Sequence, residues 1–340
     1  MKLPLYIENT AQLEDIMSMP SDALVEFVAG LADDILILGA GGKIGPTMAL
    51  MAKRAIKEAG VKRDVIAVDV LGLPQLEKAG IKTIKCNMLD LDEVRALPRC
   101  ENVIYMVGRK FGSTGTEWLT WAVNVMVPHN VASVYTQARV AVFSTGCVYP
   151  VVDLKTGGST EDMPANPVGE YAMSCLGRER MFDYYAAEQG EHVVQIRLNY
   201  AVELRYGVFV DIATKVFKGQ PVDLTTGHIN GMWQGDVCDQ VIRALNYATS
   251  PASVLNITGP EIISVRWLAS EFGELFDKEP VFKGTENGMG YLNNAIKANS
   301  LFGNPSVPVG TLIRWIAYWI KNGGDNIGKP THFETQNGRY

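Results

Sequence analysis

Residues 35 to 69 decide the fold, and they read Ile35-Leu36-Ile37-Leu38, Gly39-Ala40-Gly41-Gly42-Lys43-Ile44-Gly45 and, further on, Val65-Ile66-Ala67-Val68-Asp69. The first apolar run predicts a buried strand, and the apolar spacing from about residue 47 to residue 59 predicts a helix. The glycines between them allow a sharp turn and a close approach of the backbone to a ligand. N–H groups at the start of the helix favour an anion such as a pyrophosphate. The stretch therefore predicts a strand, turn and helix that bind a dinucleotide.

Asp69 ends the second apolar run, 24 positions after Gly45. A carboxylate at this place accepts hydrogen bonds from both ribose hydroxyls and repels a 2′-phosphate. A glycine triplet also occurs in ordinary turns, so the prediction depends on the strand before it, the helix after it and this acid. The sequence predicts NAD, and not NADP, as the cofactor. The residues expected to contact it are Gly39, Gly42, Lys43, Ile44, Gly45 and Asp69.

The bulk properties exclude several classes of protein. The 340 residues are enough for one large domain or two smaller ones, and 47% of them are hydrophobic, which is enough for a substantial core. The net charge of −6, without a long basic run, argues against nucleic acid as a partner. No apolar stretch is long enough to span a bilayer, and the start of the chain does not resemble a secretion signal.

Cysteine and histidine positions bear on the compartment and on metals. The five cysteines are scattered, which fits reduced thiols in a cytoplasm. The four histidines share no ligand spacing, so we expect no metal. The cysteines are Cys86, Cys100, Cys147, Cys175 and Cys238.

Strand and helix patterns alternate from residue 35 onward, which predicts an α/β fold with a Rossmann-type doubly wound parallel sheet. Strands are expected near 35–38, 65–69, 81–86, 102–107, 139–144 and 193–198. The expected units are an N-terminal helical extension at 1–32, an NAD-binding domain at 33–200 with a return near 233–258, a smaller C-terminal substrate lobe at 201–232 and 259–322, and a tail at 323–340. In the extension, Ser21 or Asp22 is expected to cap a helix. Helices are also expected over 265–276 and 309–321, and the polar tail is expected to be loose.

Further motifs follow the fifth predicted strand. Ser144-Thr145 precedes Tyr149 by five and four residues, and Tyr171 comes later. With the glycine loop and Asp69, these motifs resemble the NAD-dependent epimerase/dehydratase family, the extended short-chain dehydrogenase/reductases, over about residues 33–322. Three more positions match the family's pattern: Glu179 on the helix of Tyr171, Arg197 in the next strand, and Asp236-Val237 at a later helix.

The resemblance implies an oxidoreductase, epimerase or dehydratase. In it Thr145 holds the reacting oxygen and Tyr171 exchanges its proton. A phenol has an unperturbed pKa near 10, so it acts as a base near neutral pH only if this pKa is lowered. Alternatively, Tyr171 merely packs on its helix.

Cys175 stands where the family has a lysine, four residues after the tyrosine. One helical turn brings position 175 beside Tyr171, where a lysine would stabilise the phenolate and hold the cofactor ribose. A thiol does neither well, so Tyr171 is expected to stay mostly protonated and to serve better as a donor. Cys175 itself is either a small buried side chain or a reactive thiol.

The resemblance also places Asn87 and Met88 at the adenine, and Val107 and Gly108 at the end of the fourth strand beside the cofactor. Arg109 and Lys110 follow at the carboxyl end of the sheet, where ligands bind. They are expected to grip an acidic substrate or the pyrophosphate, or else to belong to a solvated loop.

Substrate positions depart from those of family members that act on nucleotide sugars. Those members usually have an asparagine three residues after the strand arginine, where this chain has Tyr200, and Asn199 stands one residue earlier. The arginine that binds a diphosphate, expected near His228 and Trp233, is not visible. A free sugar, sugar acid or polyol is therefore favoured. Asn199 and His228 are candidate contacts, and Trp233 is either a contact or part of the core.

Two functions stay open. One is an NAD-dependent enzyme that acts on a hydroxyl or carbonyl of a carbohydrate-like molecule as a dehydrogenase, epimerase or dehydratase. The other is a catalytically weak protein that senses NAD or a sugar, which Cys175 favours and which the retention of Thr145 and Tyr171 opposes. We expect no nucleic-acid or membrane partner. We do expect a homodimer, because family members pair through two helices that here carry apolar residues, Trp118, Trp121, Val125, Val134, Met181, Phe182 and Tyr185.

Overall fold

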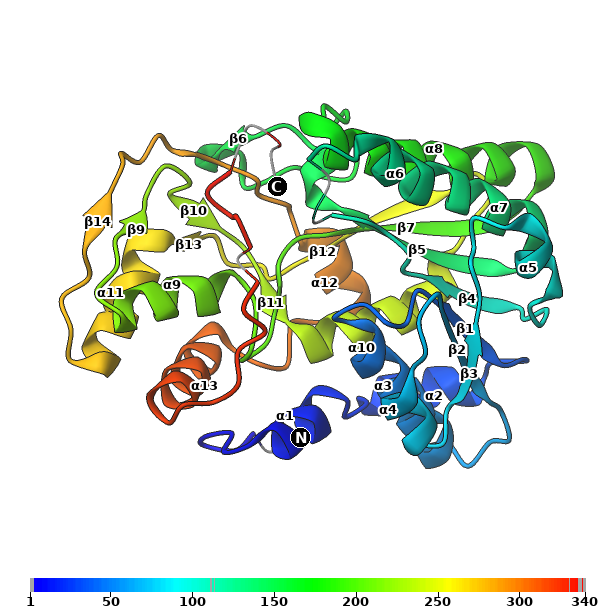
Figure 1. The fold of residues 1–340 in the computed structure, drawn as a ribbon, viewed down its shortest axis with the longest axis horizontal. Helices are drawn as coiled ribbons and strands as arrows, with labels where there is room; N and C mark the ends of the chain where they lie inside the picture. The colour runs from blue at the N-terminus through cyan, green and yellow to red at the C-terminus, as the bar shows by residue number, and fades with distance from the viewer. Residues whose placement is uncertain (1–2, 111, 113, 330, 336–337, 339–340) are drawn as a thin grey trace.

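The computed structural model describes residues 3–110, 112, 114–329, 331–335 and 338. Its centre is a parallel sheet of seven strands in the order β12-β7-β5-β4-β1-β2-β3 (Figure 1). The strands are β1 (Ile35–Leu38), β2 (Val65–Asp69), β3 (Lys82–Lys85), β4 (Asn102–Tyr105), β5 (Arg139–Thr145), β7 (His192–Leu198) and β12 (Ser253–Ile257). This arrangement confirms the predicted Rossmann-type fold class.

Helices cover both faces of this sheet, as Figure 1 shows. One face packs on α2 (Asp22–Ala29), α3 (Gly45–Glu58) and α10 (Gln234–Ala244), and the other on α5 (Leu91–Ala96), α7 (Val127–Val134) and α8 (Gly169–Gln189). Ile35 and Ile37 face the first group of helices, and Leu36 and Leu38 face the second. Successive strand side chains point to opposite faces, so a strand buried on both faces is apolar throughout.

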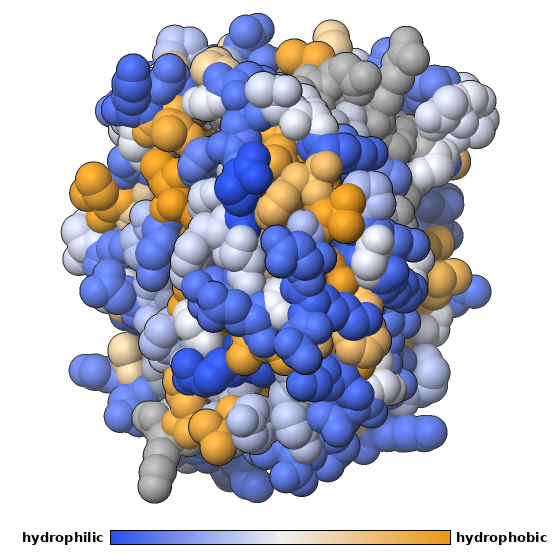
Figure 2. Space-filling view, turned by 90° about the vertical axis from the view of Figure 1, so that its left-hand side faces the viewer, coloured by the Kyte–Doolittle hydropathy of each residue, from blue (hydrophilic) through white to orange (hydrophobic). Residues whose placement is uncertain are grey.

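A second lobe packs around its own core at the other end of the molecule. Its main helices are α9 (Val208–Phe217), α11 (Val265–Phe276) and α13 (Val309–Lys321). Trp233 is 1% exposed and packs edge-on against Trp315, with ring centroids 5.5 Å apart, so it belongs to this core. On the outer surface of this end, hydrophobic side chains lie in small separate groups among polar ones (Figure 2).

The remaining elements are short. The helical ones are α4 (Pro74–Lys78), α6 (Glu117–Trp121), the π-helical turn η1 (Ala122–Met126), the 3-10 turns η2 (Gly146–Val148), η3 (Leu154–Thr156) and η4 (Leu245–Tyr247), and α12 (Ile296–Phe302). The strands are β6 (Val152–Asp153), β8 (Ala201–Val202), β9 (Val222–Asp223), β10 (His228–Ile229), β11 (Met232–Trp233), β13 (Ile263–Ser264), β14 (Phe282–Lys283) and β15 (Met289–Gly290). Within the part of the chain that is described, no helix combines the length and the apolar character needed to cross a membrane.

The N-terminal extension divides between the two cores. Its first helix, α1 (Thr10–Met17), places Leu13 in the core of the second lobe, whereas α2 places Leu24 in the core beneath the sheet. The hydroxyl of Ser21 accepts a hydrogen bond from the N–H of Leu24, which confirms one of the two expected caps. The predicted domain boundaries remain a prediction.

The C-terminal tail was expected to be loose, but its described residues pack against the body of the protein. It crosses from α13 toward the start of α8 over the junction of the two lobes (Figure 1). Thr331 donates to the Asp211 carboxylate through its N–H, at 2.7 Å, and through its hydroxyl, at 2.5 Å. Phe333 is 2% exposed. Asp211 lies on α9, as does Lys215, whose ammonium is 5.5 Å from the ring centroid of Phe333. The polar composition of the tail gave no indication of these contacts.

Candidate functional site

A pocket of about 330 Å³ opens between the sheet and the second lobe. It lies at the carboxyl ends of β1, β4, β5 and β7, and the strand order reverses between β1 and β4. Ligands of open α/β sheets bind at such a point. The lining residues are Gly39, Gly42, Lys43, Ile44, Met106, Gly108, Lys110, Phe143, Ser144, Thr145, Cys147, Tyr171, Arg178, Leu198, Asn199, Tyr200, Ala201, Tyr206, Gly207 and Thr331.

The glycine loop between β1 and α3 forms one wall. Gly39 has a φ of 88°, and a Cβ on it would lie 2.7 Å from the N atom of Val107. A Cβ on Gly45 would lie 2.3 Å from the carbonyl oxygen of Ala40. A side chain is excluded at both positions because it would meet backbone atoms. A Cβ on Gly42 would lie 3.7 Å from the carbonyl oxygen of Gly39, an ordinary contact, and Gly42 lines the pocket. The loop therefore fits the close approach of a dinucleotide.

Asp69 lies at the end of β2, beside the glycine loop. Its Oδ2 accepts a hydrogen bond from the N–H of Gly41 at 2.8 Å, and its Oδ1 accepts one from the N–H of Leu71 at 3.1 Å. A Cβ on Gly41 would be 2.8 Å from this carboxylate. The structure thus fixes the carboxylate against the loop.

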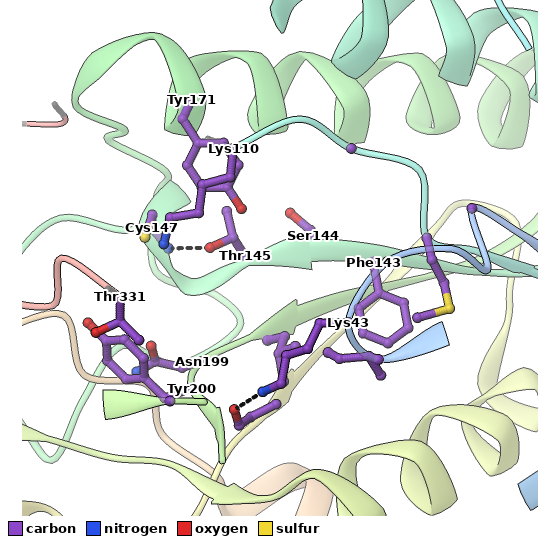
Figure 3. Close-up of a pocket in the computed structure, with 18 of the residues that line it drawn as sticks. Lys43, Lys110, Phe143, Ser144, Thr145, Cys147, Tyr171, Asn199, Tyr200 and Thr331 are labelled. Atoms are coloured by element: carbon purple, nitrogen blue, oxygen red, sulfur yellow. Dashed lines mark hydrogen bonds between the residues drawn. The ribbon is translucent and has the colours of Figure 1, made fainter. Parts of the chain in front are cut away.

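Thr145 and Tyr171 line the same end of the pocket. Thr145 ends β5, and Tyr171 points down from the first turn of α8 toward it (Figure 3). The Oγ1 of Thr145 accepts the N–H of Cys147 at 3.2 Å, which leaves the hydroxyl hydrogen of Thr145 to donate. A hydroxyl donor and a phenol therefore line one end of the pocket.

The surroundings of Tyr171 keep its proton in place. Burial raises the pKa of Tyr171 well above its ordinary value, the thiols of Cys175 and Cys147 raise it further, and Arg178 opposes the rise. Cys175 is fully buried, and burial raises the pKa of its thiol as well. A protonated, inaccessible thiol fits the small buried side chain and not the reactive thiol, since only thiolates are nucleophilic.

The side chains of Arg109 and Lys110 point in different directions. The ammonium of Lys110 lies 5.7 Å from the ring centroid of Tyr171, inside the pocket (Figure 3). Burial lowers the pKa of this ammonium. The guanidinium of Arg109 turns away and donates to the carbonyl oxygen and hydroxyl of Thr116, at 3.1 and 2.9 Å. Arg109 therefore holds its own loop and does not line the pocket.

Lys43 bridges the glycine loop and the second lobe. Its Nζ donates to the carbonyl oxygen of Ala201 at 3.0 Å and lies 4.4 Å from the ring centroid of Tyr206 (Figure 3). Burial lowers its pKa from 10.5 to about 8. This cation lies where a diphosphate at the start of α3 would be within reach.

The other predicted residues take varied positions. Asn199 lines the pocket while its amide donates to Asn230, at 2.7 Å. Met88 is buried in the core between the sheet and α5, α7 and α8, and the side-chain oxygen of Asn87 accepts the N–H of Leu89 at 3.3 Å. Val107 packs on the core, and His228, in β10, is not among the lining residues.

Sequence reasoning missed several lining residues, among them Arg178, Cys147, Tyr206 and Thr331. The sequence could have indicated Arg178, because it is seven residues after Tyr171 and so lies on the same face of the helix. Thr331 had none, because only the path of the tail brings it here. Among the residues described, no group of three or more His, Cys, Asp or Glu side chains is arranged to hold a metal ion.

Residues 35–202 match the family described as NAD dependent epimerase/dehydratase family. This part of the chain belongs to that family. The match covers the glycine loop, Asp69, Thr145 and Tyr171, and it confirms the predicted class of enzyme and its cofactor, NAD. It does not reach most of the second lobe. No curated protein matches the chain.

Solved structures of similar fold include epimerases and a dehydratase. UDP-glucose 4-epimerase of Thermotoga maritima, with UDP-glucose, superposes with a TM-score of 0.69 at 19% identity, over 85% of this chain and 98% of that one. The protein MoeE5, with UDP-glucuronic acid and NAD, gives 0.68 at 21% identity, over 85% and 99%. The dTDP-glucose 4,6-dehydratase of Bacillus anthracis, with NAD, gives 0.69 at 17%, over 86% and 97%. At these identities the likeness concerns the fold.

Proposed function

We propose that this family member acts on a hydroxyl or carbonyl of a carbohydrate-like substrate, with Thr145 holding the reacting oxygen and Tyr171 exchanging its proton. The observation that carries this proposal is the placement of both side chains at one end of a pocket whose other wall is the glycine loop. NAD, when bound, supplies hydride acceptance and donation at the reacting carbon. The glycine loop and Lys43 are suited to its diphosphate, and Asp69 to its ribose.

Tyr171 serves as the donor in this proposal, because its pKa is raised. It gives its proton to a carbonyl oxygen that Thr145 orients. The reverse step, oxidation of an alcohol, needs the phenolate, so it is expected to be slow at neutral pH and to speed up as the pH rises. Incubating the protein with NAD and a panel of sugars, sugar acids and polyols tests the proposal. Release of NADH indicates a dehydrogenase, and a change in product mass or configuration without it indicates a dehydratase or epimerase.

The substrate proposed is a free sugar, sugar acid or polyol. The described lining residues from residue 200 onward are all uncharged: Tyr200, Ala201, Tyr206, Gly207 and Thr331. Arg205 is paired with Glu203 and Glu14, outside this lining. The second lobe thus supplies no lining cation of its own for a diphosphate carried by the substrate, and Lys43, which reaches Ala201 and Tyr206 from the glycine loop, is assigned to the diphosphate of NAD. Nucleotide sugars, which two of the similar solved structures contain, are the alternative, and adding UDP-glucose and UDP-glucuronic acid to the substrate panel distinguishes it.

Lys110→Met is expected to weaken an acidic substrate about tenfold or more and a neutral one little, since a charge-assisted hydrogen bond contributes about 1.5–3 kcal/mol. KM measured for a matched sugar and sugar acid tests this. Arg109→Met is the control: its guanidinium holds a loop, so both substrates should be affected alike. If Lys110→Met raised KM equally for the sugar and the sugar acid, Lys110 would not bind the acidic group of the substrate.

Asp69→Ala is expected to narrow the preference for NAD over NADP about tenfold or more, because the carboxylate that repels the 2′-phosphate is removed. Calorimetric titration with each cofactor measures the ratio of the two dissociation constants. Asp64→Asn, at the residue just before β2, is the control, since Asp64 pairs with Lys82 on the surface. If the native protein bound NADP as tightly as NAD, Asp69 would not be selecting the cofactor.

The alternative is a protein that senses NAD or a sugar with little chemistry. Its support is the neutral, fully buried thiol of Cys175 beside Tyr171. Calorimetric binding of both ligands without turnover of any substrate in the panel would favour it.

We also propose a homodimer that pairs through α6, η1 and α8. Trp118, Met126, Met173 and Tyr184 on these elements are 70%, 56%, 46% and 55% exposed, although they are apolar or aromatic. Phe182 and Tyr185, by contrast, are buried against the sheet. Sedimentation should show a dimer at micromolar concentration that Trp118→Ser weakens. A monomer across that range would contradict the proposal.

A further inference from the structure

The guanidinium of Arg178 is a buried cation in the wall of the pocket. Arg178 is three residues after Cys175 and seven after Tyr171, so all three lie on one face of α8. It is 4% exposed. Its two terminal nitrogens donate to the carbonyl oxygen of Phe143, at 2.7 Å, and to the side-chain oxygen of Asn124, at 2.9 Å. Both acceptors are neutral, so these bonds hold the guanidinium in place without neutralising its charge.

The neighbouring carboxylate of Glu179 is committed elsewhere. It accepts two hydrogen bonds from Arg197, at 3.0 and 2.8 Å, and one from the hydroxyl of Ser144, at 2.6 Å. Glu179 and Arg197 therefore balance each other, and the charge of Arg178 is left over. The Nε of Arg178 is buried without a hydrogen-bond partner among the described residues.

An excess buried charge is costly, since desolvation of one ion costs several kcal/mol even after the protein relaxes. The surrounding residues nevertheless make room for this one. A Cβ at Gly108, three residues after β4, would lie 2.6 Å from a terminal nitrogen of Arg178, so a glycine at this position leaves the space that the guanidinium occupies. The described lining of the pocket includes Lys43 and Lys110 but no carboxylate. The charge of Arg178 is therefore available to an anion formed or bound in the pocket.

We propose that Arg178 is a positioning residue for Tyr171, whose fixed charge stabilises the phenolate that forms when Tyr171 gives its proton to the reacting oxygen. The O–H bond of Tyr171 breaks in this step, the proton moves to that oxygen, and the phenolate later recovers a proton from solvent. The inference rests on the proposed function, because only proton exchange by Tyr171 creates the phenolate.

Arg178 and Tyr171 line the same pocket, and the charge of Arg178 opposes the raised pKa of Tyr171. The other groups that face Tyr171 are the thiols of Cys175 and Cys147, which raise that pKa, and the ammonium of Lys110, 5.7 Å from its ring centroid. The guanidinium of Arg178 also lies 5.8 Å from the ring centroid of the buried Tyr105.

The experiment replaces Tyr171 by a fluorinated tyrosine, whose phenol is more acidic, and follows its titration by fluorine NMR without substrate or cofactor. Arg178→Met should raise the midpoint by about one pH unit, because an adjacent opposite charge changes a pKa by about 1–3 pH units. Arg178→Lys should stay close to the native midpoint. Arg180→Met is the matched control, since Arg180 lies on the same helix but is exposed and pairs with Asp183 at 2.8 Å.

Turnover gives the second readout. For alcohol oxidation, which needs the phenolate, Arg178→Met should lower kcat at neutral pH about tenfold for each pH unit by which the midpoint rises, and adding Cys175→Lys to it should restore both midpoint and rate. If Arg178→Met does not fold, Arg178→Gln with and without Cys175→Lys gives the same comparison. Equal midpoints in folded native and Arg178→Met proteins would overturn the inference. The titration needs no turnover, so it can overturn the inference without affecting the proposed function. The proposed function has its own test, which is loss of activity in Tyr171→Phe.

Discussion

Tyr171→Phe is expected to lower kcat by about two to four orders of magnitude with little change in KM, because proton transfer by a positioned side chain contributes that much. Phenylalanine keeps the ring, which packs on the cluster of Val148, Tyr149 and Cys175, and removes only the hydroxyl. The fold should therefore survive, so the loss would report on the chemistry. Steady-state kinetics on the substrate found in the panel measures both constants.

Tyr184→Phe is the control for this substitution. Tyr184 lies on the same helix but is 55% exposed, so its hydroxyl should not affect turnover. A Tyr171→Phe protein with the native rate would mean that another group moves the proton. The sensing alternative would then gain weight, and Thr145→Val would show whether the reacting oxygen is held at this end of the pocket at all.

Arg197→Met is expected to cost about 3–5 kcal/mol of unfolding free energy, because it leaves a buried carboxylate without its partner. Glu179 is fully buried, and Arg197 reaches it from β7 while stacking 4.6 Å from the ring centroid of Tyr149. This pair joins α8 to the sheet directly beneath the pocket. Denaturant unfolding followed by circular dichroism measures the loss.

Two further variants separate the pair from its general surroundings. Arg180→Met removes an exposed partner of Asp183 and should cost about 0–1 kcal/mol. Arg197→Met combined with Glu179→Leu should be more stable than Arg197→Met alone, because no uncompensated charge stays buried. A double variant less stable than the single one would mean that Glu179 keeps its own favourable contacts, such as the bond from Ser144, when its partner is gone.

Elements with strong local patterns were predicted closely. The apolar runs at 35–38 and 65–69 are β1 and β2, and the helices predicted over 265–276 and 309–321 are α11 and α13. Weak patterns failed. The first helix, α1, was not separated from α2, and β12 was seen only as a return of the chain. An edge strand and a short helix are held mainly by their neighbours, so their own residues carry little signal.

The sequence by itself determined the sheet, the glycine loop and the acid at the end of β2, because each depends on residues close together in the chain. Only the tertiary structure decided which side chains share the pocket. It turned Arg109 into its loop while leaving Lys110 beside Tyr171, and it brought Thr331 across from the tail. It also left Arg178 without a carboxylate, because Glu179 is paired with Arg197 from another strand. Such contacts depend on how remote segments pack, and packing distances are not encoded in local periodicity.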